Sequence, residues 1–232
     1  MEIKELQGLK KLLDSKEKML KGEVVVSVAN EVARNLLNQY YSKGPIFPVD
    51  IRGLVDFMKI DIYESNLNVD RGFRIEKVNG YLRKNLDGKY AINIQNSDSE
   101  FVKRYILSHE LSHYLLDCGG STGSESNPCG QKCIDPLFAK DWDEMFSDML
   151  AAFILFPPEL VLEHLQMYTD QMRKLNRYPL DASEWLRELG QCAQVSYYFT
   201  IVSYQSIKFY MCYLYNHNKD DEIIRKYIDF FK

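Results

Sequence analysis

Long apolar runs are missing from this sequence. No segment approaches the ~18 to 20 consecutive apolar residues that a membrane-spanning helix requires, and the first residues, Met1 to Glu5, lack the apolar core of a signal peptide. An excess of charge of one sign is also missing, because 29 Lys and Arg residues stand against 33 Asp and Glu residues, a net charge of −4. Such a balance gives no general field for binding nucleic acid or an anionic membrane. We therefore expect a cytoplasmic protein that binds neither directly.

Cysteine is sparse, with five residues in 232. An odd number cannot form a complete disulfide framework, and free thiols are expected in a reducing compartment. Cys118, Cys129 and Cys133 lie together in one glycine-containing segment. Their spacing fits no established metal-binding pattern, so ordinary loop cysteines are preferred to a three-thiolate site, and their role is left open.

Histidine is scarce as well, with four residues, but two of them lie in His109-Glu110-Leu111-Ser112-His113. On a helix the two imidazoles are about 40° apart around the axis and roughly one turn apart along it, so both can bind one cation. Glu110 lies at the edge of this face, where it can contact a water at the open position of the metal. The His-Glu-x-x-His spacing indicates a zinc hydrolase. The alternative is an ordinary helix that carries two histidines by chance.

The flanking residues favour a buried helix around the motif. Ser97-Asp98-Ser99-Glu100 has the pattern of a capping box, so a helix is expected to begin there, and Gly119-Gly120 is expected to end it. Buried imidazoles need partners for both ring nitrogens, and a metal on one with a carboxylate on the other would satisfy them. Between those marks runs a broad apolar stripe formed by Phe101, Val102, Tyr105, Ile106, Leu111, Leu115 and Leu116.

An acidic stretch at residues 141–148 opens a second predicted helix, which ends at Pro157-Pro158. Glu144 and Asp148 are four residues apart and therefore share a face. Glu144 is the candidate third zinc ligand, and Asp148 is expected to accept the second nitrogen of a ligating histidine and so fix its tautomer. Carboxylates that favour the positive end of a helix dipole are the alternative interpretation, which explains the first acids of the stretch better than these two.

A small sheet is expected before the zinc-motif helix. Residues 60–63 alternate between apolar and polar as a strand does. Residues 80–84 and 89–94 flank an Asp87-Gly88 turn and predict a β-hairpin. Because the second strand leads almost directly into the helix, the sheet should pack beside it, and one edge strand could hold an extended peptide. The sequence does not say which strand forms that edge.

Taken together, these motifs resemble the ImmA/IrrE family of zinc metallo-endopeptidases. The family pattern runs from His-Glu-x-x-His to Glu-x-x-x-Asn/Asp, an Ala-Ala pair and a Leu-x-Pro ending. Phe47-Pro48-Val49-Asp50-Ile51 with Leu54 resembles the opening segment of the family, and Val195-Ser196 resembles its closing segment. Two departures are Ser112, where a smaller residue is usual, and a long cysteine-containing segment before Glu144. The matching residues are His109, Glu110, His113, Glu144, Asp148, Ala151, Ala152, Leu155 and Pro157.

The resemblance implies a gluzincin-like enzyme with zinc bound by His109, His113 and Glu144, Glu110 as the catalytic base and Asp148 behind a ligand. It also implies an α+β fold, mostly helical and zincin-like, with a small antiparallel sheet packed beside the motif helix and further helices toward the C-terminus. We expect an N-terminal helical segment at 1–42, the metallopeptidase core at 43–175 and a C-terminal helical segment at 176–232, packed as one unit with the core.

The substrate that the resemblance implies is a helix-turn-helix repressor, whose cleavage would derepress mobile-element or stress genes. Two alternatives stay open: a non-catalytic, zinc-containing interaction module, and a toxin-like or stress hydrolase with another target. The residue that would stabilise the oxyanion is also open, with His164, His217 and the tyrosines as candidates. Both histidines are more typical of surface positions than of a site.

Overall fold

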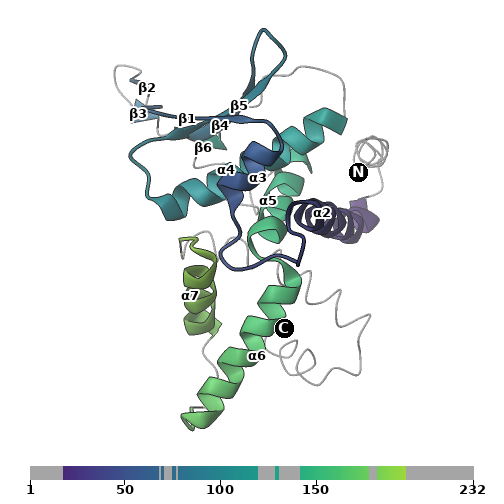
Figure 1. The fold of residues 1–232 in the computed structure, drawn as a ribbon, viewed down its shortest axis with the longest axis vertical. Coiled ribbons are helices and arrows are strands. Elements are labelled where there is room, and N and C mark those ends of the chain that lie inside the picture. Colours follow the sequence, from purple (N-terminus) through teal and green to yellow (C-terminus); the bar gives the residue numbers. More distant parts are fainter. Residues whose placement is uncertain are drawn as a thin grey trace.

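The computed structural model describes residues 18–67, 69–70, 75–76, 78–119, 129–130, 142–177 and 182–196 (Figure 1). Helices dominate this part of the chain, and a small sheet covers one side of them. In chain order the elements are α2 (Lys18–Tyr40), α3 (Ile51–Phe57), β1 (Asp61–Ser65), β2 (Val69–Asp70), β3 (Ile75–Glu76), β4 (Val78–Lys84), β5 (Tyr90–Gln95), α4 (Glu100–Gly119), β6 (Cys129–Gly130), α5 (Trp142–Leu155), α6 (Pro158–Lys174) and α7 (Ala182–Ala193).

Several expectations lie outside the described residues. They are the first 17 residues of the N-terminal helical segment expected at 1–42, His217 and the rest of the chain after Ser196, Cys133, and the side chains of Cys118 and Cys129. The division of the chain into three segments stays a prediction. Among the described helices, none combines the length and the apolar character that a membrane crossing needs.

The predicted hairpin is formed by β4 and β5, which pair in antiparallel fashion with Gly80 opposite Ile94. Its turn contains Asp87 and Gly88, and Gly88 has a φ of +83°, a left-handed conformation that glycine adopts without steric cost. In the described part of the chain the main sheet has the strand order β1-β5-β4-β6.

Strand β1 pairs with the other edge of β5, and the two run in parallel. The sheet is therefore mixed, whereas the sequence predicted an antiparallel one. Strands β1 and β4 lie on the two sides of β5 and run in opposite directions, so β5 has one parallel and one antiparallel neighbour. The α+β class itself is confirmed.

Helix α4 packs directly on β4 and β5. The approach is close at Gly80, where an added Cβ would lie only 2.4 Å from Cγ2 of Ile106 on α4. The apolar side of the hairpin, which includes Leu82, Ile92 and Ile94, is buried in the hydrophobic core. Glycine at position 80 is thus required to bring the motif helix against the strand beside it.

The start of α4 differs in detail from the predicted capping box. Ser99, and not Ser97, lies next to the first helical residue, and its Oγ accepts a hydrogen bond from the backbone N–H of Val102 at 3.4 Å. Glu100 does not reach back to the cap, because its carboxylate pairs with Arg52 and Lys103 instead. The described part of the helix extends to Gly119, and Gly120, the second residue of the predicted end, lies outside the described residues.

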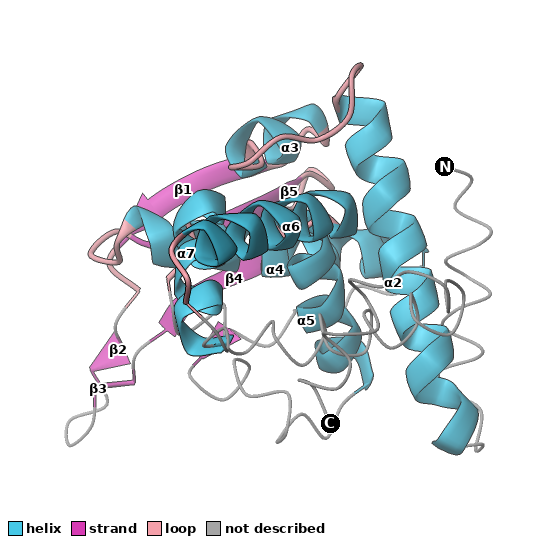
Figure 2. Cartoon of the chain, turned by 90° about the horizontal axis from the view of Figure 1, so that it is seen from below, coloured by secondary structure: helices cyan, strands magenta, loops and turns pink. Residues whose placement is uncertain are grey.

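Helix α5 packs between α4 and α2, and Figures 1 and 2 show α2 on the side of α5 that faces away from the sheet. Ala151 and Ala152 are buried, which allows α4 and α5 to come close together. At this contact Oγ of Ser108 donates a hydrogen bond of 3.2 Å to the carbonyl of Ala151. A side chain of α4 therefore bonds to the backbone of α5, which fixes the two helices relative to one another.

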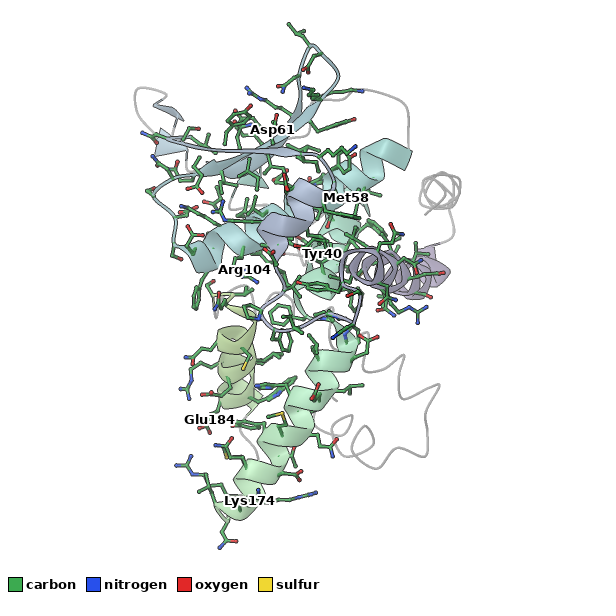
Figure 3. All side chains as sticks on the ribbon, viewed as in Figure 1. Tyr40, Met58, Asp61, Arg104, Lys174 and Glu184 are labelled. Atoms are coloured by element: carbon green, nitrogen blue, oxygen red, sulfur yellow. The ribbon has the colours of Figure 1, made fainter. Side chains whose placement is uncertain are left out.

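After the break at Pro157, α6 and α7 form an arm below the core (Figure 1). Arg104 of α4 links this arm to the motif helix. Its guanidinium donates hydrogen bonds to the carbonyls of Val49 (2.6 Å) and Ala193 (3.3 Å), the last residue of α7. Figure 3 shows Arg104 where α4 comes close to α7. The same side chain thus fixes the chain segment before α3 and the end of α7.

Candidate metal centre

Two imidazoles face each other on one side of α4. His109 is fully buried and His113 is nearly so, and their Nε2 atoms are 3.0 Å apart. The spacing of four residues places the rings one turn apart, with centroids separated by 4.7 Å. The pair predicted from the sequence is therefore formed, with one nitrogen of each ring directed to a common point.

Glu144 reaches this point from α5. Its Oε2 lies 3.4 Å from Nε2 of His109, and its Oε1 lies 3.5 Å from Nε2 of His113. One donor atom from each of the three side chains lies within 4.8 Å of the others, so the group could hold a metal ion. Ligands about 2.0 to 2.1 Å from a tetrahedral ion are about 3.4 Å from one another. The observed spacings of 3.0, 3.4 and 3.5 Å are close to that value.

The other nitrogen of each ring faces α5. Oδ1 of Asp148 lies 2.9 Å from Nδ1 of His109, although the N–H direction of the ring departs from the line to this oxygen. Oγ of Ser147 lies 3.2 Å from Nδ1 of His113. Tyr105 donates a hydrogen bond of 3.1 Å from its hydroxyl to Oδ1 of Asp148.

These contacts test whether the residues present fit a metal ion. The carboxylate of Asp148 can only accept, so the proton of a neutral His109 belongs on Nδ1. When the hydroxyl of Ser147 accepts from Nδ1 of His113 in the same way, the lone pairs of both Nε2 atoms point at one another. Two lone pairs 3.0 Å apart beside a carboxylate repel unless a cation lies between them. In the described part of the chain, the buried Oε2 of Glu144 also has no hydrogen-bond partner. The donor set fits a metal ion.

The same contacts determine the charge states of His109 and Glu144. Burial disfavours a charged imidazole at His109, but the contacts with Asp148 and Glu144 outweigh it and raise the pKa of His109 well above its ordinary value. Burial disfavours a charged Glu144, but its contacts with His109 and His113 outweigh it and lower the pKa of this carboxyl. Positive charge is favoured between these side chains, and a divalent cation would supply it in place of protons.

Glu110 is fully buried between α4 and the sheet. Its Oε2 accepts a hydrogen bond of 2.8 Å from the backbone N–H of Leu82 on β4. Among the described residues, no group donates to its Oε1. Burial raises the pKa of Glu110 above the usual value for a carboxyl. One oxygen is thus held by the sheet, and burial makes the carboxylate more basic than an exposed one.

The sequence reasoning located the predicted ligands but missed two neighbours. His109, His113, Glu144 and Asp148 lie together as expected. Tyr105 was assigned to the apolar stripe, and Ser147 was not considered. The only signals in the sequence were their positions, with Tyr105 four residues before His109 and Ser147 immediately before Asp148.

His164, one of the candidates for the oxyanion role, lies on α6 and not on a helix that supplies the metal site. Burial lowers its pKa, and the charge that opposes this shift is Glu188 of α7. His164 therefore lies on the side of α6 that is near α7, and it is not part of the candidate metal site.

A scan against models of protein families gave no match, and a search of curated proteins gave none either. The grouping of His109, His113 and Glu144 therefore stands on its own geometry.

Proposed function

We propose that the chain is a zinc-dependent endopeptidase of narrow specificity, similar to the ImmA/IrrE family. The observation that carries the proposal is the convergence of Nε2 of His109, Nε2 of His113 and the Glu144 carboxylate, with 3.0 to 3.5 Å between them. Two imidazoles and one carboxylate form the ligand set of catalytic zinc in several peptidases, which keep the fourth position for water. Only these three side chains form such a group among the described residues.

A zinc ion bound there would lower the pKa of a water ligand and polarise a peptide carbonyl. Glu110 supplies the base, because its unpartnered Oε1 can accept the proton of the water and then deliver it to the leaving amine nitrogen. The hydrogen bond from Leu82 holds the other oxygen, so the carboxylate stays oriented through both proton transfers. Asp148 and Ser147 hold the rings of the two histidine ligands.

Strand β4 is the candidate for binding an extended peptide. It lies against α4, and its Leu82 N–H contacts Glu110, so a peptide beside this strand would pass close to the base. In the described part of the chain β6 pairs with Val78 and Gly80 only, which leaves the Tyr81–Lys84 half of β4 without a strand on that side. Main-chain pairing to such an edge binds peptides in extended form.

The proposed substrate is a helix-turn-helix repressor, and the proposed setting is the cytoplasm. The substrate comes from the family resemblance and the setting from the lack of long apolar runs in the sequence. The mild net charge of −4 agrees with an effect on transcription through a protein and not through DNA. Narrow specificity follows from the setting, because a general peptidase would damage other proteins in the same compartment. We expect casein to be cut poorly or not at all.

The test combines metal analysis with the Glu110→Gln variant. The wild-type protein should bind about one zinc per chain and cleave a repressor encoded by a neighbouring gene. Glu110→Gln should retain the zinc but lose about 100- to 10,000-fold in cleavage rate, because it cannot accept the proton. Glu163→Gln, at an exposed position of α6, is the matched control and should leave both unchanged.

Two outcomes would contradict the proposal. A wild-type protein that binds no zinc would remove the enzyme hypothesis altogether. If wild type and Glu110→Gln relieve repression equally while both bind zinc, the chain acts as a binding module and not as a peptidase.

A further inference from the structure

Tyr105 places a hydroxyl in a part of the core where packing alone does not need one. Its side chain is almost completely buried and stacks beside the ring of His109, with centroids 6.3 Å apart. A phenylalanine would fill the same volume without the cost of burying a polar group. The hydroxyl offsets that cost by donating to Oδ1 of Asp148, the oxygen that also lies next to Nδ1 of His109.

A second buried hydroxyl, that of Ser147, lies next to the imidazole of His113. Ser147 is fully buried on α5, and its Oγ lies 3.2 Å from Nδ1 of His113. Alanine would again satisfy the packing of two closely spaced helices. The two imidazoles of α4 are thus contacted from α5 by adjacent residues, Ser147 on His113 and Asp148 on His109.

We infer that the hydroxyls of Tyr105 and Ser147 are positioning groups of the metal centre. Tyr105 acts on His109 through Asp148, and Ser147 acts on His113 directly. The inference rests on the metal binding of the proposed function. It goes beyond the ligand set, because it assigns a role in metal binding to two side chains that do not touch the ion.

The physical basis is the orientation of the rings. A metal ligand loses affinity when its ring can rotate away, and the hydrogen-bond partner on the opposite nitrogen prevents this rotation. Asp148 can itself take more than one rotamer, and the donation from Tyr105 selects the one in which Oδ1 lies next to His109. Without the hydroxyl of Ser147, Nδ1 of His113 would lose its partner, a costly state for a mostly buried ring.

The test uses Tyr105→Phe and Ser147→Ala, each of which removes only an oxygen atom and its hydrogen bonds. Zinc affinity is measured by competition with a chromophoric chelator. We expect Ser147→Ala to weaken zinc binding about tenfold, within the range typical of partners behind a ligand, and Tyr105→Phe to weaken it about three- to tenfold. Tyr168→Phe and Thr169→Val are the matched controls, because they remove buried hydroxyls from α6. Both controls should bind zinc as the wild type does.

Two further readouts separate positioning from a general loss of stability. In protein loaded with cobalt(II), the visible absorption bands report ligand geometry, and they should shift in Tyr105→Phe and Ser147→Ala but not in the controls. A double-mutant cycle tests whether Tyr105 affects zinc binding through Asp148. In an Asp148→Ala background, Tyr105→Phe should cause no further loss of zinc affinity, because the carboxylate through which it acts is gone.

The outcomes distinguish this inference from the proposed function. If the wild type binds zinc and both hydroxyl variants bind it with unchanged affinity and unchanged cobalt bands, the inference is wrong while the metal centre stands. An additive effect of Tyr105→Phe in the Asp148→Ala background would refute the route through Asp148. A wild type without zinc would remove the proposed function and the inference together.

Discussion

Lys103 is a charged residue of α4 whose side chain is largely buried. Its side chain is 8% exposed, and its Nζ lies 2.7 Å from Glu64 of β1 and 3.1 Å from Glu100. Arg52 of α3 contacts the same two carboxylates. The two carboxylates stabilise the charge of this ammonium, and the group of ion pairs joins β1 and α3 to the start of the motif helix.

Replacement of Glu64 by Gln should lower the free energy of unfolding by about 1 to 2 kcal/mol at neutral pH, because Lys103 loses a charged partner. Hydrogen bonds from Lys103 and Arg52 lower the pKa of Glu64. A lowered pKa in the folded state gives stability above the unfolded-state pKa, and this stability is lost as the pH falls through the folded-state pKa. Urea denaturation should therefore show the largest difference near pH 7 and convergence of the two proteins at acid pH.

Asp170→Asn provides the comparison for this prediction. Asp170 pairs with Arg173 at 3.4 Å on α6, where both side chains are 52% exposed. Such a surface pair should contribute less than about 0.5 kcal/mol. Equal effects of the two substitutions would mean that the burial of Lys103 has no energetic importance.

Residue identity alone predicted the candidate ligands and Asp148 behind His109, but not Tyr105 or Ser147. The His-Glu-x-x-His spacing fixes the geometry of His109 and His113, because both lie on one helix whose repeat is known. Tyr105 and Ser147 meet the site only through the contact between α4 and α5. An aromatic residue in an apolar stripe satisfies the helical periodicity whether or not its hydroxyl has a partner, so the stripe concealed the role of Tyr105.

Among the secondary-structure elements, the contact between β4 and α4 determines where Glu110, the proposed base, lies. Gly80 allows the strand to come against Ile106, and two residues later the N–H of Leu82 holds Glu110. A side chain at position 80 would have to move the helix or the strand. The distance between strand and helix is therefore linked to the orientation of the base.

Gly80→Ala should destabilise the protein by about 1 to 3 kcal/mol, because its Cβ would lie 2.4 Å from Cγ2 of Ile106 and 3.0 Å from the carbonyl of Asn93. Catalytic activity should fall further than the loss of folded protein explains, because the bond between Leu82 and Glu110 is strained at the same time. Thermal unfolding and the kcat of the folded fraction are the measurements.

A second substitution tests the cause. Ile106→Leu removes the Cγ2 methyl while it keeps the side-chain volume, so it should restore part of the stability in the Gly80→Ala background. If Gly80→Ala is as stable and as active as the wild type, the helix and the strand are not held at the distance that the structure gives.

The elements differ in how far the sequence could predict them. The hairpin and the helices α4 and α5 follow from local signals, namely the Asp87-Gly88 turn, apolar periodicity and the proline pair. The parallel pairing of β1 with β5 does not, because the partner of an edge strand depends on contacts far apart in the sequence. The sequence did not predict the cap at Ser99. Glu100 bonds to Arg52 and Lys103 and not to the start of the helix, and these tertiary contacts cannot be read from a local pattern.

At the scale of the whole molecule, the candidate metal ligands come from two helices that are separated in the chain. His109 and His113 belong to α4 and Glu144 to α5, and both helices belong to one continuous hydrophobic core. An ion bound by all three side chains would join these helices only in the folded state. Metal binding should therefore contribute to global stability.

Removal of metal by a chelator should lower the thermal unfolding temperature by on the order of 10 °C. An ion present at about 1,000 times its dissociation constant stabilises the folded state by about 4 kcal/mol, and each kcal/mol shifts the midpoint of a chain of this size by roughly 2 to 4 °C. Calorimetry with and without EDTA measures the difference. Glu144→Gln should remove most of the response, and an equal response in Glu144→Gln and wild type would exclude Glu144 as a ligand.

Helix α5 carries Glu144, Ser147 and Asp148, which occupy an arc of about 100° around its axis. A small rotation of this helix about its axis would therefore displace Glu144 and the partners of both imidazoles together. The three contacts should accordingly form or break as a unit. The same layout places the proposed base and the candidate carboxylate ligand on different helices, since Glu110 belongs to α4 and Glu144 to α5. A substitution on α5 alone, for example Glu144→His, should therefore change the metal preference and leave Glu110 in place.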